Sequence, residues 1–134
     1  MNDAVDSARC AGRPIPDAGV YVAVFRLAGV RRIRVGRLGQ FDFPAGYYLY
    51  AGSAQRHLGA RLDRHGRADK PRHWHVDYLS AEADMIGALV VPGPKSRECE
   101  LAAELAECFA LAVPGFGASD CRCPGHLAYT ECLP

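Results

Sequence analysis

A run of six residues near the start of the chain most constrains its fold. Residues 20–25 read Val-Tyr-Val-Ala-Val-Phe and hold no charged side chain. β-branched and aromatic residues favour strands, and a strand that is apolar on both faces is typical of the middle of a covered sheet. The run therefore predicts a central strand.

Several later segments also have strand patterns. Residues 32–38 alternate charged and apolar side chains, which predicts a strand with one face in water. Residues 41–43 and the aromatic run 47–50 flank the turn at residues 44–46, so we expect them to be sequential antiparallel strands. Residues 85–91 predict another buried strand that ends at a proline.

Helical spacing appears in three places between and after these strands. It predicts a basic helix from Gln55 to about Gly66, a short helix opened by Pro71, and a third helix that Ser96 can cap. The sum is an α+β fold with a small, mostly antiparallel central sheet flanked by about three helices. Residues 1–17 mix acids, glycine and prolines and predict a flexible leader, followed by a single domain over residues 18–134.

Length and composition agree with one water-soluble globular domain. The chain has 134 residues, of which 49% are hydrophobic and 23% charged. No apolar run approaches the roughly 20 residues that a membrane helix needs, and residues 1–13 lack the apolar block of a secretory signal. We therefore expect a cytoplasmic protein.

Arginine dominates the basic residues. The net charge is only +1, but 14 of the 16 basic residues are arginine, which suits bidentate phosphate contacts. Residues 56–75 hold six Lys or Arg against two Asp, with four of the five histidines. This local excess fits a nucleic-acid contact, although charge clusters on helices are often only solvated surface.

Two short motifs resemble the two halves of the GIY-YIG nuclease signature. They are Gly19-Val20-Tyr21, after the leader, and Tyr50-Ala51-Gly52, before the basic helix. Arg61, His65 and Glu98 then stand where that superfamily places a helix arginine, a following aromatic or histidine, and a glutamate that opens a later helix. Over residues 18–130 the chain resembles a GIY-YIG-like family through residues 43–54, 73–78, 98–99 and 115–123.

The resemblance implies a GIY-YIG-like fold and metal-dependent hydrolysis of phosphodiester bonds in DNA. The long segment between Tyr21 and Tyr50 then requires an inserted hairpin that returns Tyr50 to the side of Tyr21. That family occurs alone or appended to DNA-repair endonucleases, which implies DNA as substrate and a DNA-repair protein as partner, while RNA stays open. Asp120 is the candidate to replace an asparagine that the superfamily commonly carries.

The expected roles follow from what phosphodiester cleavage needs. Glu98 offers a hard oxygen ligand for one Mg²⁺ or Mn²⁺, and Arg61 is expected to clamp the phosphate. The resemblance implies that Tyr21 positions or deprotonates the attacking water, which requires Arg61 and the metal to lower its pKa from near 10. Tyr50 would orient the phosphate or the water, and His65 would assist proton transfer.

Each of these residues also has an ordinary structural explanation. Tyrosine is a favoured strand residue, Glu98 could simply complement a helix N-terminus, and Arg61 could be surface. The competing function is a non-catalytic nucleic-acid-binding module, in which Trp74 or Tyr47 stacks on a base. Its phosphate contacts would come from Arg32, Arg34, Arg56, Arg61, Arg64 and Arg72. The two hypotheses part at Glu98, because a pure binder needs no metal-binding carboxylate.

The C-terminal part holds a second motif, Cys121-Arg122-Cys123 followed by His126. Cys-x-Cys-x-x-His offers soft ligands for a structural zinc, with further ligands possible from Cys99, His73, His75 and Asp77. Reduced cysteines that pack as small apolar groups are the alternative, and the sequence favours them. His75, Asp77, Ser119 and Asp120 are also candidates to line the cleft.

Overall fold

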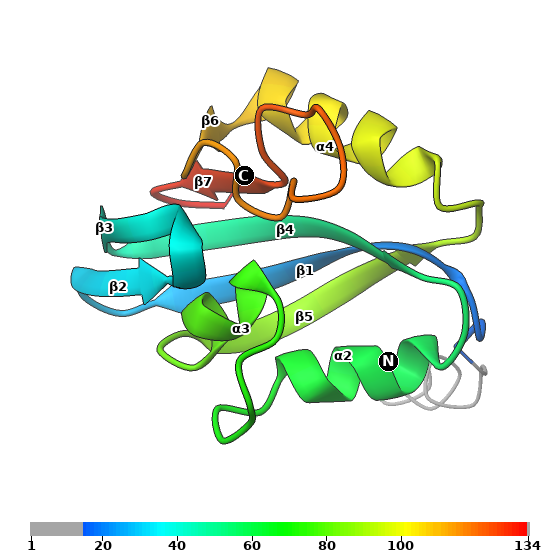
Figure 1. Ribbon diagram of the computed structural model, residues 1–134, viewed down its shortest axis with the longest axis horizontal. Coiled ribbons are helices and arrows are strands. Elements are labelled where there is room, and N and C mark those ends of the chain that lie inside the picture. Colours follow the sequence, from blue (N-terminus) through cyan, green and yellow to red (C-terminus); the bar gives the residue numbers. More distant parts are fainter. Residues whose placement is uncertain (1–14, 134) are drawn as a thin grey trace, which may run out of the picture.

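The computed structural model describes residues 15–133 and has an α+β fold (Figure 1). The five-stranded antiparallel sheet has the order β5-β1-β4-β7-β6, and β2 and β3 form a separate two-stranded sheet. The strands are β1 (Gly19–Leu27), β2 (Arg31–Val35), β3 (Gly39–Phe43), β4 (Gly46–Ala54), β5 (Asp84–Val91), β6 (Ala110–Leu111) and β7 (Leu127–Thr130). The helices are α2 (Leu58–His65), α3 (His75–Ser80) and α4 (Arg97–Cys108), with a 3₁₀ turn η1 (Gly36–Leu38). The predicted fold class is confirmed.

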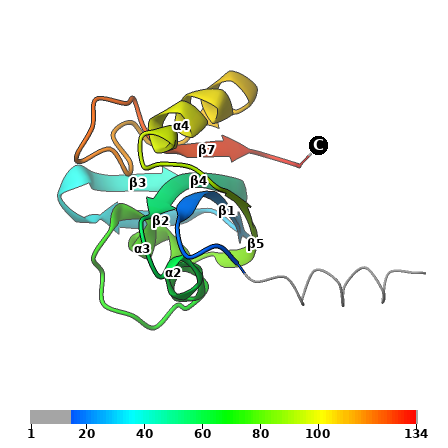
Figure 2. The ribbon, with the colours of Figure 1, turned by 90° about the vertical axis from the view of Figure 1, so that its right-hand side faces the viewer.

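Helices cover both faces of the main sheet. Figure 2 shows α4 on one side of it, with α2 and α3 on the other. Val22 of β1 packs with Leu49 and Ala128 against Leu101 and Leu105 of α4. The alternate β1 residues, Tyr21, Ala23 and Phe25, lie in the larger core, which contains Leu58 and Leu62 of α2 and Val76 and Leu79 of α3. This two-sided burial accounts for the apolar run at residues 20–25.

The segment between β1 and β4 forms the inserted hairpin that the sequence required. β2 pairs only with β3, while β4 returns to pair directly with β1. The register sets Tyr21 opposite Gly52 and Ala23 opposite Tyr50. The strand predicted for residues 32–38 ends at Val35, because Gly36 has a φ of +50° and begins the 3₁₀ turn.

Three local expectations are wrong. β5 is not buried, because it lies at the edge of the sheet with Ile86 and Leu89 at least half exposed. Helix α3 begins at His75 rather than Pro71. Ser96 makes no side-chain cap on α4.

The N-terminal end of α2 is held by a residue from outside the sheet. Asp17 accepts the backbone N–H of His57 through its carboxylate at 3.0 Å and that of Leu58 through its carbonyl at 3.1 Å. Residues 1–14 of the expected leader lie outside the described residues. Within residues 15–133, no helix has the length and apolar character needed to cross a membrane.

Candidate functional site

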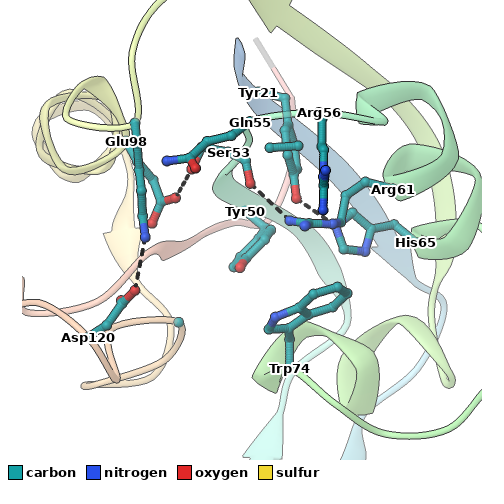
Figure 3. Close-up of a pocket in the computed structure, with 13 residues that line it drawn as sticks. Tyr21, Tyr50, Ser53, Gln55, Arg56, Arg61, His65, Trp74, Glu98 and Asp120 are labelled. Atoms are coloured by element: carbon teal, nitrogen blue, oxygen red, sulfur yellow. Dashed lines mark hydrogen bonds and ion pairs between the residues drawn. The ribbon is translucent and has the colours of Figure 1, made fainter. Parts of the chain in front are cut away.

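One cleft of about 370 Å³ opens beside the ends of β1 and β4 (Figure 3). It brings together side chains from the two tyrosine strands, from α2, from the first turn of α4 and from the loop before β7. The lining residues are Tyr21, Tyr50, Ser53, Ala54, Gln55, Arg56, Arg61, His65, Trp74, Lys95, Glu98, Gly117 and Asp120. All five residues that the resemblance singled out are therefore in one cleft.

Gly52 allows the two tyrosines to approach each other. A Cβ atom at Gly52 would lie 2.6 Å from Cζ of Tyr21 and 2.9 Å from Cε2 of Tyr50. Those distances are well inside van der Waals contact, so any larger residue must displace a ring. The tyrosine rings lie with centroids 6.4 Å apart. The close packing of the Tyr21 and Tyr50 rings thus requires a glycine at position 52.

Tyr21 and His65 form a buried polar pair. The hydroxyl of Tyr21 lies 2.7 Å from Nε2 of His65, and each residue is 1% exposed. Burial lowers the pKa of His65 to about 4, so near neutral pH its ring is uncharged and can accept the hydroxyl hydrogen. Within residues 15–133, Nδ1 of His65 has no hydrogen-bond partner.

Arg61 by itself does not lower the pKa of Tyr21 below its ordinary value. Burial raises the pKa of Tyr21 to about 12, and this outweighs the lowering by the nearby charge of Arg61. Burial also raises the pKa of Tyr50 well above its ordinary value. Both hydroxyls therefore carry their hydrogens near neutral pH, so Tyr21 can pass on a proton but does not start as a base.

Arg61 lies over Trp74 at the basic side of the cleft. Its guanidinium carbon is 4.3 Å from the Trp74 ring centroid, and its Nη1 donates to the Ser53 carbonyl at 2.9 Å. Arg64 also stacks on Trp74, at 5.0 Å, but its Nη2 donates to the buried carboxylate of Asp77 at 2.7 Å. Arg61 is thus the arginine turned to the cleft, whereas Arg64 is tied to the fold.

Glu98 and Asp120 form the acidic side of the cleft. Oε1 of Glu98 accepts from Ser53 Oγ at 2.5 Å, and Oε2 lies 3.0 Å from Nδ1 of His126. Burial raises the pKa of Glu98, but the hydrogen bonds from His126 and Ser53 outweigh it and leave that pKa below its ordinary value. Asp120 lies 3.5 Å from Lys95 Nζ. The cleft therefore has a cationic wall opposite a carboxylate wall.

The expected nucleic-acid contacts separate into two groups. Arg56 and Trp74 line the cleft. Arg72 does not line it and instead donates to the Lys70 carbonyl at 2.6 Å. Arg32 and Arg34 lie on β2, in the hairpin, and neither lines the cleft. Arg32 is paired with Asp42 at 2.9 Å. The structure thus does not join the hairpin arginines to the basic wall.

Three of the four additional cleft candidates do not line it. Nδ1 of His75 accepts the backbone N–H of Gly117 at 2.8 Å and so fixes the loop that carries Gly117. Asp77 is fully buried and accepts the backbone N–H groups of His73 and Trp74, which caps α3. Ser119 is exposed outside the cleft. Of the four, only Asp120 lines it.

A second cluster lies behind the acidic wall. The ligand atoms of Cys99, Cys121, Cys123 and His126 all lie within 4.8 Å of one another. These residues could hold a metal ion, and thiolate and imidazole donors favour zinc over Mg²⁺ or Mn²⁺. Cys99 thus joins the motif as the sequence allowed, but His73, His75 and Asp77 do not belong to this cluster.

Sequence reasoning passed over several residues of the cleft. Ser53 bridges its two walls, because its hydroxyl bonds to Glu98 and its carbonyl to Arg61. Gln55 and Lys95 also line the cleft. The only available signal for Ser53 was its place just after the Tyr-x-Gly motif, near the end of β4; a single small polar residue in a strand does not indicate a site.

A comparison with protein-family models matches residues 20–133 to a family described as "Domain of unknown function DUF123". Neither the comparison with curated proteins nor that with solved structures gave a match.

Proposed function

The chain belongs to the DUF123 family, and we propose that it is a metal-dependent endonuclease that hydrolyses phosphodiester bonds of DNA. The observation that carries this proposal is the convergence of Arg61, Glu98 and the Tyr21–His65 pair on one open cleft. These groups supply a cationic side chain to bind the phosphate, a carboxylate to bind a metal ion, and a proton acceptor. Phosphodiester hydrolysis needs all three.

Phosphate binding would fall to the basic wall. Arg61 presents a guanidinium that stacking on Trp74 holds in place, and a pre-oriented planar fork suits two phosphate oxygens. Arg56 lines the same cleft and adds positive charge for neighbouring phosphates, whereas Lys95 is paired with Asp120 at the acidic wall.

Proton transfer would run through Tyr21 to His65. As water attacks phosphorus, its proton moves to the Tyr21 oxygen while the tyrosine hydrogen moves to Nε2 of His65. The P–O bond to the leaving oxygen breaks, and that oxygen takes a proton from solvent water. The 2.7 Å contact supports this second transfer, and the hydroxyl starts and ends protonated. This route does not need the tyrosinate that a pKa of about 12 disfavours.

Glu98 fits a single divalent ion of the Mg²⁺ or Mn²⁺ class. Each carboxylate oxygen has two lone pairs, so the contacts to Ser53 and His126 leave acceptor capacity on both. Mg²⁺ sites commonly use one or two carboxylates together with substrate phosphates, and Asp120 lies on the same wall. When bound, the ion would supply positive charge at the scissile phosphate.

The resemblance to GIY-YIG nucleases supports the same function. The two tyrosine motifs of this chain are distant in the sequence, but the strands that carry them, β1 and β4, are adjacent. The inserted hairpin lies outside the cleft. By the same resemblance we propose that the chain works with a DNA-repair protein. RNA is the alternative substrate.

The second candidate is a binding module that uses the same cleft without cleavage. One observation favours it, because both oxygens of Glu98 already have partners in the protein. Such a module would use Arg61 and Trp74 as a phosphate and base platform. It would bind nucleic acid equally well with and without a divalent ion.

A cleavage assay distinguishes the two candidates. Labelled linear, flap and branched DNA is incubated with the chain, supplied with zinc for its Cys/His cluster, in Mg²⁺, in Mn²⁺ and without either ion. Omission of the ion is preferable to a chelator, which would also remove any metal ion from the Cys/His cluster. We expect cleavage only with a divalent ion, loss of cleavage in Arg61→Ala, and normal cleavage in Arg34→Ala. Binding without cleavage under all conditions would support the binding module.

A further inference from the structure

We propose that Cys99, Cys121, Cys123 and His126 bind one structural zinc ion, which holds the acidic wall of the cleft in place. The proposal concerns a second metal site, distinct from the single carboxylate of Glu98. It does not depend on whether the cleft cleaves DNA.

The spacing of the four donor atoms fits a tetrahedral ion. Zn–S bonds of about 2.3 Å and Zn–N bonds of about 2.0 Å put the donors of a tetrahedron roughly 3.8 Å apart for two sulfurs and roughly 3.5 Å apart for sulfur and nitrogen. Here Nε2 of His126 lies 3.5 Å from Sγ of Cys121 and 3.9 Å from Sγ of Cys99. All four donors lie within 4.8 Å of one another. Only small side-chain movements would complete the shell.

The His126 ring is already oriented as a metal ligand. Its Nδ1 faces two acceptors, the Glu98 carboxylate at 3.0 Å and the Ala51 carbonyl at 3.2 Å. In the neutral ring that binds a metal, Nδ1 therefore carries the hydrogen, and the lone pair of Nε2 is directed at the cysteine sulfurs. A carboxylate behind a ligating histidine is the usual outer shell of a protein zinc site.

Three of the four ligands lie in an irregular loop. Residues 112–126, all within the described part of the chain, contain no helix or strand, and the first half of this loop is held by the buried side chains of Val113 and Phe116. Loops of this length without secondary structure are uncommon in compact domains and usually serve a function. Three of the ligands come from this loop and Cys99 comes from the first turn of α4, so one ion would join the loop to the helix.

The same ion would fix the acidic wall. Glu98 directly precedes the ligand Cys99, and Asp120 directly precedes the ligand Cys121. Glu98 also accepts the hydrogen of the ligand His126. A zinc at this cluster would therefore set the position of both carboxylates that line the cleft.

The first test is the zinc content of the full chain, purified under reducing conditions without a chelator. We expect one zinc per chain, and loss of it in Cys121→Ser and Cys123→Ser. Cys108 and Cys132 are exposed and outside the cluster, so Cys108→Ser and Cys132→Ser should keep the zinc. Zinc absent from the wild-type chain even after titration, or lost equally in the control variants, would overturn the proposal.

A spectroscopic test on the wild-type chain decides the matter if the cysteine variants fail to fold. Co²⁺ exchanged into the site should give the intense visible bands of a tetrahedral ion, together with thiolate charge-transfer absorption. The weak spectrum of an octahedral ion without thiolate bands would overturn the assignment.

A pair of variants tests the link between the zinc site and the cleft. Glu98→Gln should lower the zinc affinity about 10- to 100-fold, as outer-shell changes do. Glu100, in the same turn, contacts Arg97 and is not a member of the cluster, so Glu100→Gln should leave the affinity unchanged. Competition with a coloured zinc chelator measures both, and equal affinities in the two variants would contradict the link.

Discussion

The hydroxyl of Tyr21 and Nε2 of His65 lie 2.7 Å apart in a buried pair that joins β1 to α2 at the bottom of the cleft. Because the ring is neutral and the hydroxyl is protonated near pH 7, the pair can relay a proton without first separating charge. It is also the contact on which the proposed chemistry most depends.

Replacement of either member of this pair should slow DNA cleavage. We expect Tyr21→Phe and His65→Gln each to lower the single-turnover rate about 10²- to 10⁴-fold, the usual contribution of a positioned proton acceptor. The double variant should be little slower than either single variant, since both remove one relay. Tyr48→Phe is the control: this buried tyrosine donates to the Pro44 carbonyl outside the cleft, so cleavage should persist.

The same histidine should make stability depend on pH. The folded chain holds the pKa of His65 near 4 through burial and the charge of Lys70, against the opposing charge of Asp77, whereas the unfolded chain has about 6.5. Between these values the unfolded state binds the extra proton, so the free energy of unfolding falls as pH drops from about 6.5 to 4. The loss is on the order of 3 kcal/mol.

Urea unfolding of the wild type and of His65→Gln at several pH values measures this contribution. Both proteins keep the Cys/His cluster, so its titration cancels in the difference. The difference in unfolding free energy between them should narrow as pH falls. Parallel pH profiles would show that burial does not suppress protonation of His65.

Gly52 should resist even the smallest enlargement. Gly52→Ala places a methyl group 2.6 Å from the Tyr21 ring, and we expect a loss of about 1–3 kcal/mol in unfolding free energy together with reduced cleavage. Gly87→Ala, in the edge strand β5, meets nothing within 4 Å and should be nearly neutral. Equal stability of the two variants in urea unfolding would mean that the tyrosine rings can move apart freely.

Asp77 should contribute far more to stability than a comparable surface aspartate. It is fully buried beside Arg64 and Lys70 and accepts two backbone N–H groups, so Asp77→Ala leaves two donors without partners and removes the anion that faces two cations. We expect a cost of about 3–5 kcal/mol. Asp42→Ala breaks an exposed pair with Arg32 and should cost at most about 1 kcal/mol. Thermal unfolding of both variants compares these two losses of stability. A smaller loss in Asp77→Ala than in Asp42→Ala would contradict the prediction.

The sequence predicts the layered fold well where a residue pattern reports burial directly. The apolar run of β1 is buried on both faces of the sheet, as its pattern indicated. β5 was misjudged, because a continuous apolar run fits an edge strand as well as a buried one. Its exposure depends on which strands pair, and residue spacing does not encode that.

The candidate site was only partly accessible from sequence for a similar reason. Short motifs located the residues of the tyrosine strands and Arg61, but Ser53 joins the two walls through contacts to residues far along the chain. Burial also outweighs the lowering of the Tyr21 pKa by Arg61, and this desolvation depends on the packing of α2 against the sheet. Cys99 reaches the other cysteines only because α4 lies beside the loop that precedes β7.

The measurement that tests the proposed nuclease most directly is single-turnover cleavage and binding of one labelled DNA by wild-type chain and Glu98→Gln. Both proteins should be saturated with zinc and then supplied with Mg²⁺. The account predicts Mg²⁺-dependent cleavage by the wild type and at least about a 10²-fold loss in Glu98→Gln, with DNA binding retained. Equal cleavage by the two proteins, or wild-type binding without any cleavage, would contradict it.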